Sequence, residues 1–192
     1  AVGSSGNPEP FEITDILFER IVGRNVLQKH VDKAAFLEIL KSWILPEGFF
    51  VFGETVPALC QRLSDLIPKE LIDYEFLRTL KTAEEEIYHD SAITRSNWTP
   101  STLREELESA NWNIRRWQVK EFSTPTVIPT KQIEQWFPAQ PDSPHSSYVQ
   151  HLSTHFTPEQ LNELRDTFRS EVAGKVVDWR SVILFMQLSQ KN

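Results

Sequence analysis

Apolar side chains recur at intervals of three and four residues along much of the chain, which is the spacing of helices with one apolar face. In the first half, this spacing predicts helices over 13–21, 36–43, 59–66 and 77–80. Pro46 and Gly48 end the second of these helices, because neither residue suits a helix interior. The run 49–52 that follows is short, apolar and extended in character.

The second half opens with the clearest helix start in the chain, because Thr99 can cap a helix whose first residue is Pro100. The apolar residues after it alternate steps of four and three, which predicts one long helix with a narrow apolar seam: Leu103, Leu107, Ala110, Ile114 and Trp117. Thr157 repeats the start signal, and Gln160 completes a capping box. That helix should end at Gly174, and a last helix should carry Trp179, Val182, Ile183 and Met186 on one face.

Two stretches of different composition divide the chain. Residues 91–97 are polar and suggest a hinge between two halves, and residues 138–156 are rich in proline and serine, which is typical of a linker. Residues 1–9 are small and flexible in character, as a tail or a cloning remnant would be. We therefore expect an N-terminal helical lobe over 10–90 and a C-terminal lobe over 98–192, with the internal linker at 138–156.

Two segments share one local pattern, in which an apolar pair, an aspartate and an aromatic residue lead into a helix. They are LIDYEFLRTL from Leu71 and VVDWRSVILF from Val176. Looser matches from Phe50 and Thr126 suggest an internal duplication. This pattern, with the FTPEQL start at Phe156, resembles the end of an EF-hand loop, where a short strand pairs with that of a twin hand. The resemblance implies a mainly α fold, with two lobes of EF-hand-like helix pairs and very short antiparallel strands between their loops.

The loops decide against calcium. An EF-hand loop needs oxygen ligands at positions 1, 3 and 5 and a bidentate glutamate at position 12. Alignment of the last loop places Ser170, Val172, Gly174 and Ser181 there, and none of these is a carboxylate. The earlier loop keeps one ligand of four, Asp65. The prediction is a degenerate, metal-free hand that acts as a non-catalytic interaction module; the alternative is a calcium-regulated sensor lobe that exposes a hydrophobic groove on metal binding.

The aromatic-rich helices and the Asp-Trp-Arg sequence at 178–180 are also similar to the C-terminal region of sperm flagellar protein 2 and related axonemal scaffolds. This resemblance implies assembly into the cytoskeleton of a cilium or flagellum axoneme. The expected partner is another protein, which presents a helix or an extended segment to apolar seams that internal packing leaves free. The candidate contact residues are Trp112, Arg115, Arg116, Phe122 and Phe137.

Charge and cysteine content narrow the setting. A net charge of -7 and a pI near 5.3 argue against a nucleic-acid-binding protein, whose affinity depends on basic residues. The single cysteine, Cys60, rules out an internal disulfide and fits a reducing compartment, so we expect a cytoplasmic location. No apolar run approaches 18 residues, so no membrane span is predicted.

Catalytic constellations do not stand out. His151 and His155 lie four residues apart, as in a metal pair, but no HExxH glutamate or nearby ligand set accompanies them, which favours linker histidines. The glycines form no phosphate-binding loop. The sequence therefore predicts a protein that is not an enzyme, with no catalytic residue, metal, cofactor or small-molecule substrate.

Overall fold

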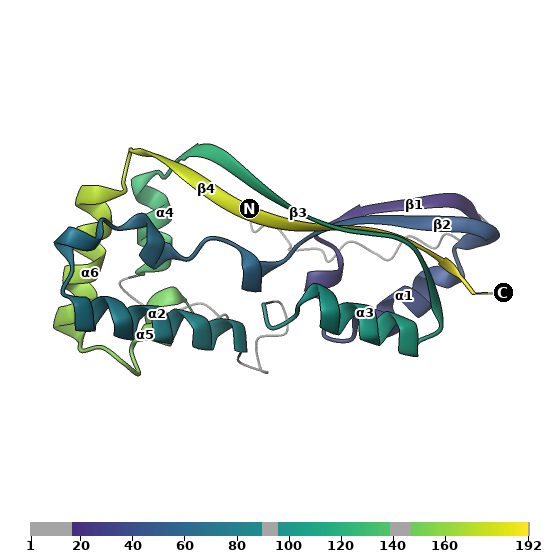
Figure 1. The fold of residues 1–192 in the computed structure, drawn as a ribbon, viewed down its shortest axis with the longest axis horizontal. Helices are drawn as coiled ribbons and strands as arrows, with labels where there is room; N and C mark the ends of the chain where they lie inside the picture. Colours follow the sequence, from purple (N-terminus) through teal and green to yellow (C-terminus); the bar gives the residue numbers. More distant parts are fainter. Residues whose placement is uncertain (1–16, 90–95, 139–146, 192) are drawn as a thin grey trace, which may run out of the picture.

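The computed structural model describes residues 17–89, 96–138 and 147–191 (Figure 1). These residues form a mixed α/β fold. Four strands, six α-helices and four short 3-10 helices follow one another in this order: β1 (Phe18–Arg24), η1 (Leu27–Lys29), α1 (Lys33–Lys41), β2 (Ile44–Thr55), η2 (Pro57–Leu59), η3 (Leu63–Leu66), η4 (Lys69–Leu71), α2 (Tyr74–His89), α3 (Pro100–Ser109), β3 (Trp112–Val127), α4 (Thr130–Trp136), α5 (Tyr148–Leu152), α6 (Pro158–Glu171) and β4 (Val176–Gln190).

The four strands form one sheet in the order β1-β2-β4-β3. β1 and β2 are parallel, and β4 is antiparallel to both of its neighbours, so β3 runs in the same direction as β1 and β2. The crossover from β1 to β2 contains α1, and the path from β2 to β3 ends with α3. Both helices lie on the same face of the sheet (Figure 1). Two parallel crossovers of one hand that move in one direction across a sheet have this result.

The four strands together with η1, α1 and α3 form one part of the molecule, which we call the sheet half. Alternate residues of its central strands supply its core. Its core joins the inward faces of β2 and β4 to the apolar faces of α1 and α3. The largest fully buried members on the strands are Phe50, Phe52 and Leu184. Full burial of one such side chain stabilises the fold by about 1.5–3 kcal/mol relative to exposure.

A second core lies in the helical lobe, which we define as η2 to α2 together with α4, α5 and α6. Both of its segments leave the sheet at the same end, one after the carboxyl end of β2 and the other after the carboxyl end of β3. The lobe therefore lies beside the carboxyl ends of the parallel strands (Figure 1). Phe168, Leu164 and Leu80 are among its fully buried side chains.

This architecture contradicts the predicted mainly α, EF-hand-like fold. The predicted last helix is the strand β4. Its alternate residues Val182, Leu184, Met186 and Leu188 are buried, and the three residues that separate them are more exposed. That alternation has the period of a strand, and it coincides over a short window with three- and four-residue steps. The predicted long helix from 103 to 117 ends as α3, because Asn111 takes a left-handed conformation with φ of 60° and β3 begins at the next residue.

The predicted lobes also mix in space. β1 and β2 come from the segment 10–90, yet β2 pairs with β4 from the segment 98–192. Residues 1–9 lie outside the described residues. Within the predicted linker 138–156, residues 139–146 also lie outside them, whereas α5 occupies 148–152 and contributes to the core of the helical lobe. None of the described helices has both the length and the apolar character needed to cross a membrane.

Candidate functional site

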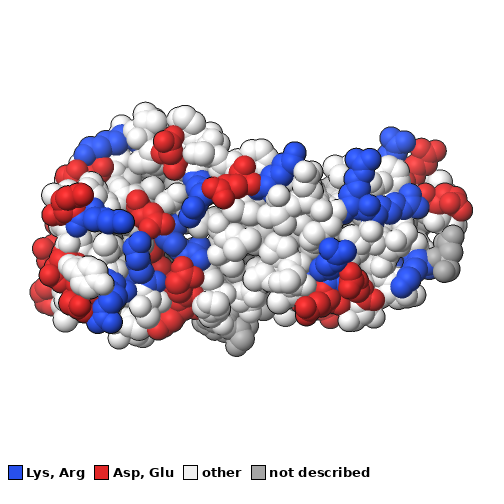
Figure 2. All heavy atoms as spheres, viewed as in Figure 1, with Lys and Arg blue, Asp and Glu red and all other residues white. Residues whose placement is uncertain are grey.

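The candidate site lies at the waist between the sheet half and the helical lobe, outside the carboxyl ends of β1 and β2. In open α/β sheets, ligands bind in the crevice at this edge. Figure 2 shows charged side chains of both signs over the helical lobe and over the far end of the sheet half. Between them lies a largely uncharged area, which acidic and basic side chains cross along its upper edge. Figure 1 places the segments that follow β1 and β2 in the same middle part of the molecule.

Asn25 shapes the loop that leaves β1. Its backbone N–H donates to the carbonyl oxygen of Gly53 at 3.0 Å, and its side-chain oxygen accepts from the N–H of Thr55 at 2.8 Å. Its φ of 52° turns the chain away from the sheet, a conformation that asparagine tolerates better than most residues. The side chain therefore continues the pairing with β2 after the backbone has left the strand.

Glu54 supports the same loop from inside the sheet half. The side chain is fully buried, and its Oε1 accepts from the N–H of Val26 at 2.9 Å. Burial raises the pKa of Glu54, while the backbone N–H groups of Val26, Leu27 and Gln28 and the charge of Lys33 act in the opposite direction. Its Oε2 is buried and has no hydrogen-bond partner among the described residues. The carboxylate thus anchors the start of η1 at the carboxyl edge of the sheet.

Residues 56–62, which we call the β2 wall, follow the carboxyl end of β2. The N–H of Val56 donates to the carbonyl of Val182 at 2.8 Å, and the N–H of Gln61 donates to the carbonyl of Arg180 at 3.0 Å. Cys60 Sγ accepts from the N–H of Val182 at 3.3 Å and donates to the carbonyl of Val56 at 3.2 Å. Burial raises the pKa of the Cys60 thiol, so it stays protonated and serves as a hydrogen-bonding group.

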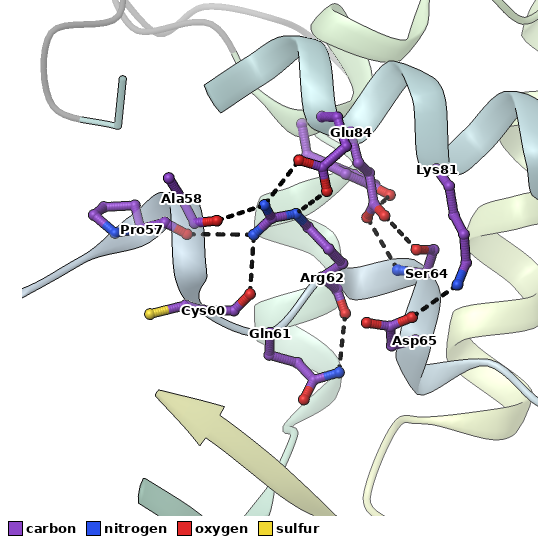
Figure 3. Close-up of polar contacts among 11 residues, drawn as sticks. Pro57, Ala58, Cys60, Gln61, Arg62, Ser64, Asp65, Lys81 and Glu84 are labelled. Atoms are coloured by element: carbon purple, nitrogen blue, oxygen red, sulfur yellow. Dashed lines mark hydrogen bonds and ion pairs between the residues drawn. The ribbon is translucent and has the colours of Figure 1, made fainter. Parts of the chain in front are cut away.

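Arg62 joins the β2 wall to α2, as Figure 3 shows. Its guanidinium donates to the backbone carbonyls of Pro57, Ala58 and Cys60 at 3.3, 2.8 and 2.9 Å. It also makes a two-pronged ion pair with Glu85 at 2.7 and 3.0 Å. The hydrogen bond from Arg62 is the largest cause that lowers the pKa of Glu85.

We call the contacts of Arg62 with the turn 57–60 and with Glu85 the clamp. Glu84 lies beside it and is almost completely buried. Its carboxylate accepts from the N–H of Ser64 at 3.0 Å, from the hydroxyl of the same serine, and from the hydroxyl of Tyr148 at 2.7 Å (Figure 3 labels Ser64 and Glu84). Burial raises the pKa of Glu84, and these hydrogen bonds oppose that shift. The network ties η3, α2 and α5 together behind the β2 wall.

A pocket of about 330 Å³ opens next to the clamp. Arg62, Lys81 and Arg180 contribute positive charge to its lining, and Asp65 and Glu85 contribute negative charge. Lys81 pairs with Asp65 at 3.0 Å (Figure 3), so the lining is polar but largely neutralised. Among the described residues, no group of three or more histidine, cysteine, aspartate or glutamate side chains is arranged to hold a metal ion.

The five predicted contact residues are not brought together. Trp112 is 2% exposed in the core of the sheet half, where its ring centroid lies 5.3 Å from that of Phe50 in an edge-to-face arrangement. Phe137 is 4% exposed in the core of the helical lobe. These two rings pack inside the protein and present no open surface. The other three lie on β3 and are exposed: Arg115, Arg116 and Phe122. A partner-binding role for those three stays a prediction.

Sequence reasoning missed Asn25, Glu54 and Arg62. A signal for the first two existed, since each lies just after an apolar run with strand character. The run 49–53 leads directly into Glu54, and the run 21–23 is followed by Arg24 and then Asn25. No local signal distinguishes Arg62, because its partners come from a turn and from a helix more than twenty residues away.

No protein-family model matches the sequence, and none of the curated proteins matches it. Several solved structures share part of its arrangement. One, from Bacillus halodurans, is provisionally described as a methyltransferase; it is 13% identical over 97% of this chain and 76% of its own, with a TM-score of 0.46. A SAM-dependent methyltransferase from Geobacter sulfurreducens, in complex with S-adenosyl-L-homocysteine, is 12% identical over 93% of this chain and 60% of its own, with a TM-score of 0.37.

A cyclopropane-fatty-acyl-phospholipid synthase-like protein from Lactobacillus casei is 12% identical over 91% of this chain and 57% of its own, with a TM-score of 0.36. This chain thus spans less than two thirds of the Geobacter and Lactobacillus proteins. Likeness at these identities and TM-scores assigns no function to this chain.

The predicted function is corrected together with the fold. The scaffold, its calcium-sensor alternative and the axonemal resemblance all depended on EF-hand lobes, and the chain forms a mixed sheet instead. The prediction of a non-catalytic module with a protein partner and no small-molecule substrate has the same basis, so the mixed sheet overturns it as well. The cytoplasmic or axonemal location stays a prediction.

Proposed function

We propose that this chain forms the ligand-binding edge of a methyltransferase domain that uses S-adenosylmethionine as its methyl donor. The observation that carries the proposal is the position of the Asn25 loop. It lies at the carboxyl end of β1, and β1 is the outermost strand of a sheet that winds in one direction only.

The winding supports a ligand position beside β1. Both crossovers move away from β1 and place their helices on one face, so the described sheet has the form of one half of a doubly wound sheet. In such sheets, the strands of the second half wind in the opposite direction, and ligands bind at the carboxyl edge where the direction reverses. Within the described residues, the outer edge of β1 is unpaired, so the reversal point would lie there.

The composition of the waist fits a nucleoside ligand. The largely uncharged area would receive a flat base, and the loop from Asn25 to Lys29 would supply backbone and side-chain polar groups. The Geobacter structure contains S-adenosylhomocysteine, which makes this nucleoside the first to test. S-adenosylmethionine, when bound, supplies an electrophilic methyl group. The Asn25 loop, together with the β2 wall that begins next to Thr55, would hold the nucleoside. The wall would also align the methyl acceptor and exclude water.

Calorimetric titration of S-adenosylhomocysteine into the full chain tests the proposal. We expect saturable binding, and we expect Asn25→Gly to weaken it about tenfold, because glycine keeps the left-handed backbone but leaves the N–H of Thr55 without its acceptor. Asn113→Gly is the matched control. Its side chain also makes one hydrogen bond, to Ser189 at 3.1 Å, but it lies on β3. A chain that takes up no S-adenosylhomocysteine, or equal affinity in both variants, would refute the proposal.

A further inference from the structure

The guanidinium of Arg62 has no hydrogen-bonding capacity left over. Arginine carries five N–H donors, and this side chain makes five hydrogen bonds: one from Nε and two from each terminal nitrogen. The plane of the group also lies over the ring of Tyr88, with Cζ 3.9 Å from the ring centroid. Only 13% of the side chain is exposed to solvent.

These contacts join two parts of the molecule, the turn 57–60 and α2. Three of the bonds close the turn 57–60 within the β2 wall, and the other two reach Glu85 on α2. The opposite side of the wall is held by β4, through Val182 and Arg180. The wall is therefore fixed by β4 on one side and by α2 on the other, and Arg62 supplies the side-chain link to α2 (Figure 3).

We propose that Arg62 is a positioning residue, which sets the conformation of the β2 wall and through it the affinity of the waist for its ligand. The second part of this inference rests on the proposed function. A lysine could not replace Arg62, because an ammonium group has three donors and no planar fork, whereas the site uses five donors in one plane. The lowered pKa of Glu85 agrees with an ionised partner for the fork.

Hydrogen exchange of backbone amides tests the clamp directly. The reporters are the N–H groups of Leu59, Cys60 and Gln61, which donate to Val56, Pro57 and Arg180 within or beside the wall. Arg62→Lys should speed their exchange about tenfold or more, because charge-assisted bonds that order the turn are lost. Amides of β4 between residues 184 and 188 should keep their protection, since they belong to the sheet ladder.

Arg169→Lys is the matched control. Arg169 also makes a two-pronged ion pair within the helical lobe, with Glu134 at 2.8 and 2.9 Å, but it does not touch the wall. We expect this variant to leave both the reporter amides and the affinity for S-adenosylhomocysteine unchanged. Arg62→Lys should weaken that affinity about tenfold. Combined with Glu85→Gln, it should weaken the affinity by less than the product of the two single effects, because both substitutions break one clamp.

The outcomes separate the two proposals. Unchanged exchange at the three reporter amides in Arg62→Lys would overturn the clamp, whatever the chain binds. Loosened amides together with wild-type affinity for S-adenosylhomocysteine would overturn the coupling of the wall to the ligand. A wild-type chain that binds no S-adenosylhomocysteine would refute the proposed function, while the exchange data would still decide whether Arg62 holds the wall.

Discussion

Similar spacing of apolar residues forms a helix in the helical lobe and a strand in the sheet half. In the helical lobe, Leu161, Leu164 and Phe168 recur at steps of three and four and form the buried stripe of α6. In the sheet half, Trp179, Val182 and Met186 have comparable steps, yet they lie on β4. The difference lies in the neighbours, because β4 is rich in β-branched residues and pairs along both edges. Local spacing is thus a reliable guide only where no sheet competes for the segment.

The largest effect should come from emptying either core. Phe50→Ala in the sheet half and Phe168→Ala in the helical lobe each remove a fully buried ring, and each should lower the free energy of unfolding by about 3–5 kcal/mol. Urea denaturation followed by tryptophan fluorescence and by far-ultraviolet circular dichroism measures both. If the two regions unfold as one unit, the two probes give coincident transitions in each variant. Separate transitions would show that the regions are independently stable.

Glu84 gives the helical lobe a pH dependence, as Glu54, whose pKa burial also raises, does in the sheet half. Its pKa is raised in the folded state, so its contribution to stability is fully present below the unfolded pKa of about 4.3 and is lost as pH rises through the folded value. The difference in unfolding free energy between the wild type and Glu84→Gln should therefore change in favour of the variant as pH rises above about 4.3. Urea titrations at a series of pH values measure this difference, and a constant difference would contradict the burial argument.

Substitution of a glycine by alanine should destabilise the sheet half more than the helical lobe, by a smaller amount than the core substitutions do. A Cβ at Gly23 would lie 2.6 Å from Val26 Cγ2 and 2.8 Å from the ring of Phe52, so Gly23→Ala should cost about 1–3 kcal/mol through overpacking. Gly174 has open space around it and a φ of +72°, so Gly174→Ala should cost about 1 kcal/mol through backbone strain alone. Thermal unfolding of both variants tests the order, which would be reversed if the sheet half could shift to admit a methyl group.

The smallest effect should be the same in both regions. Thr99 caps α3 in the sheet half, and Thr157 caps α6 in the helical lobe, each with a capping box and a proline in the first turn. Thr99→Ala and Thr157→Ala should each lower the free energy of unfolding by about 1 kcal/mol. Equal losses in chemical denaturation would indicate that helix starts act locally. A clear inequality would mean that tertiary packing changes the value of the cap.

The structure confirms some of the elements predicted from the sequence and contradicts others. The starts at Thr99 and Thr157 are confirmed. The second predicted helix ends at Lys41, but Pro46 and Gly48 do not end it, because both lie within β2. The extended run 49–52 is confirmed as part of β2. The segment 59–66 was predicted to be a helix and forms short 3-10 turns, because Arg62 and β4 satisfy its backbone groups in place of a helical ladder. The two repeated segments diverge as well, since one enters α2 and the other becomes β4.

The sequence by itself determined where α3 and α6 begin, that α6 ends shortly before Gly174, and which side chains are apolar enough to be buried. These features depend on a few neighbouring residues, so they can be found without a fold. Only the tertiary structure decided that β4 inserts between β2 and β3, that Trp112 and Phe137 lie in separate cores, and that Arg62 meets Glu85. Each of these depends on pairing between residues distant in the chain, and local spacing contains no information about which distant segment will be the partner.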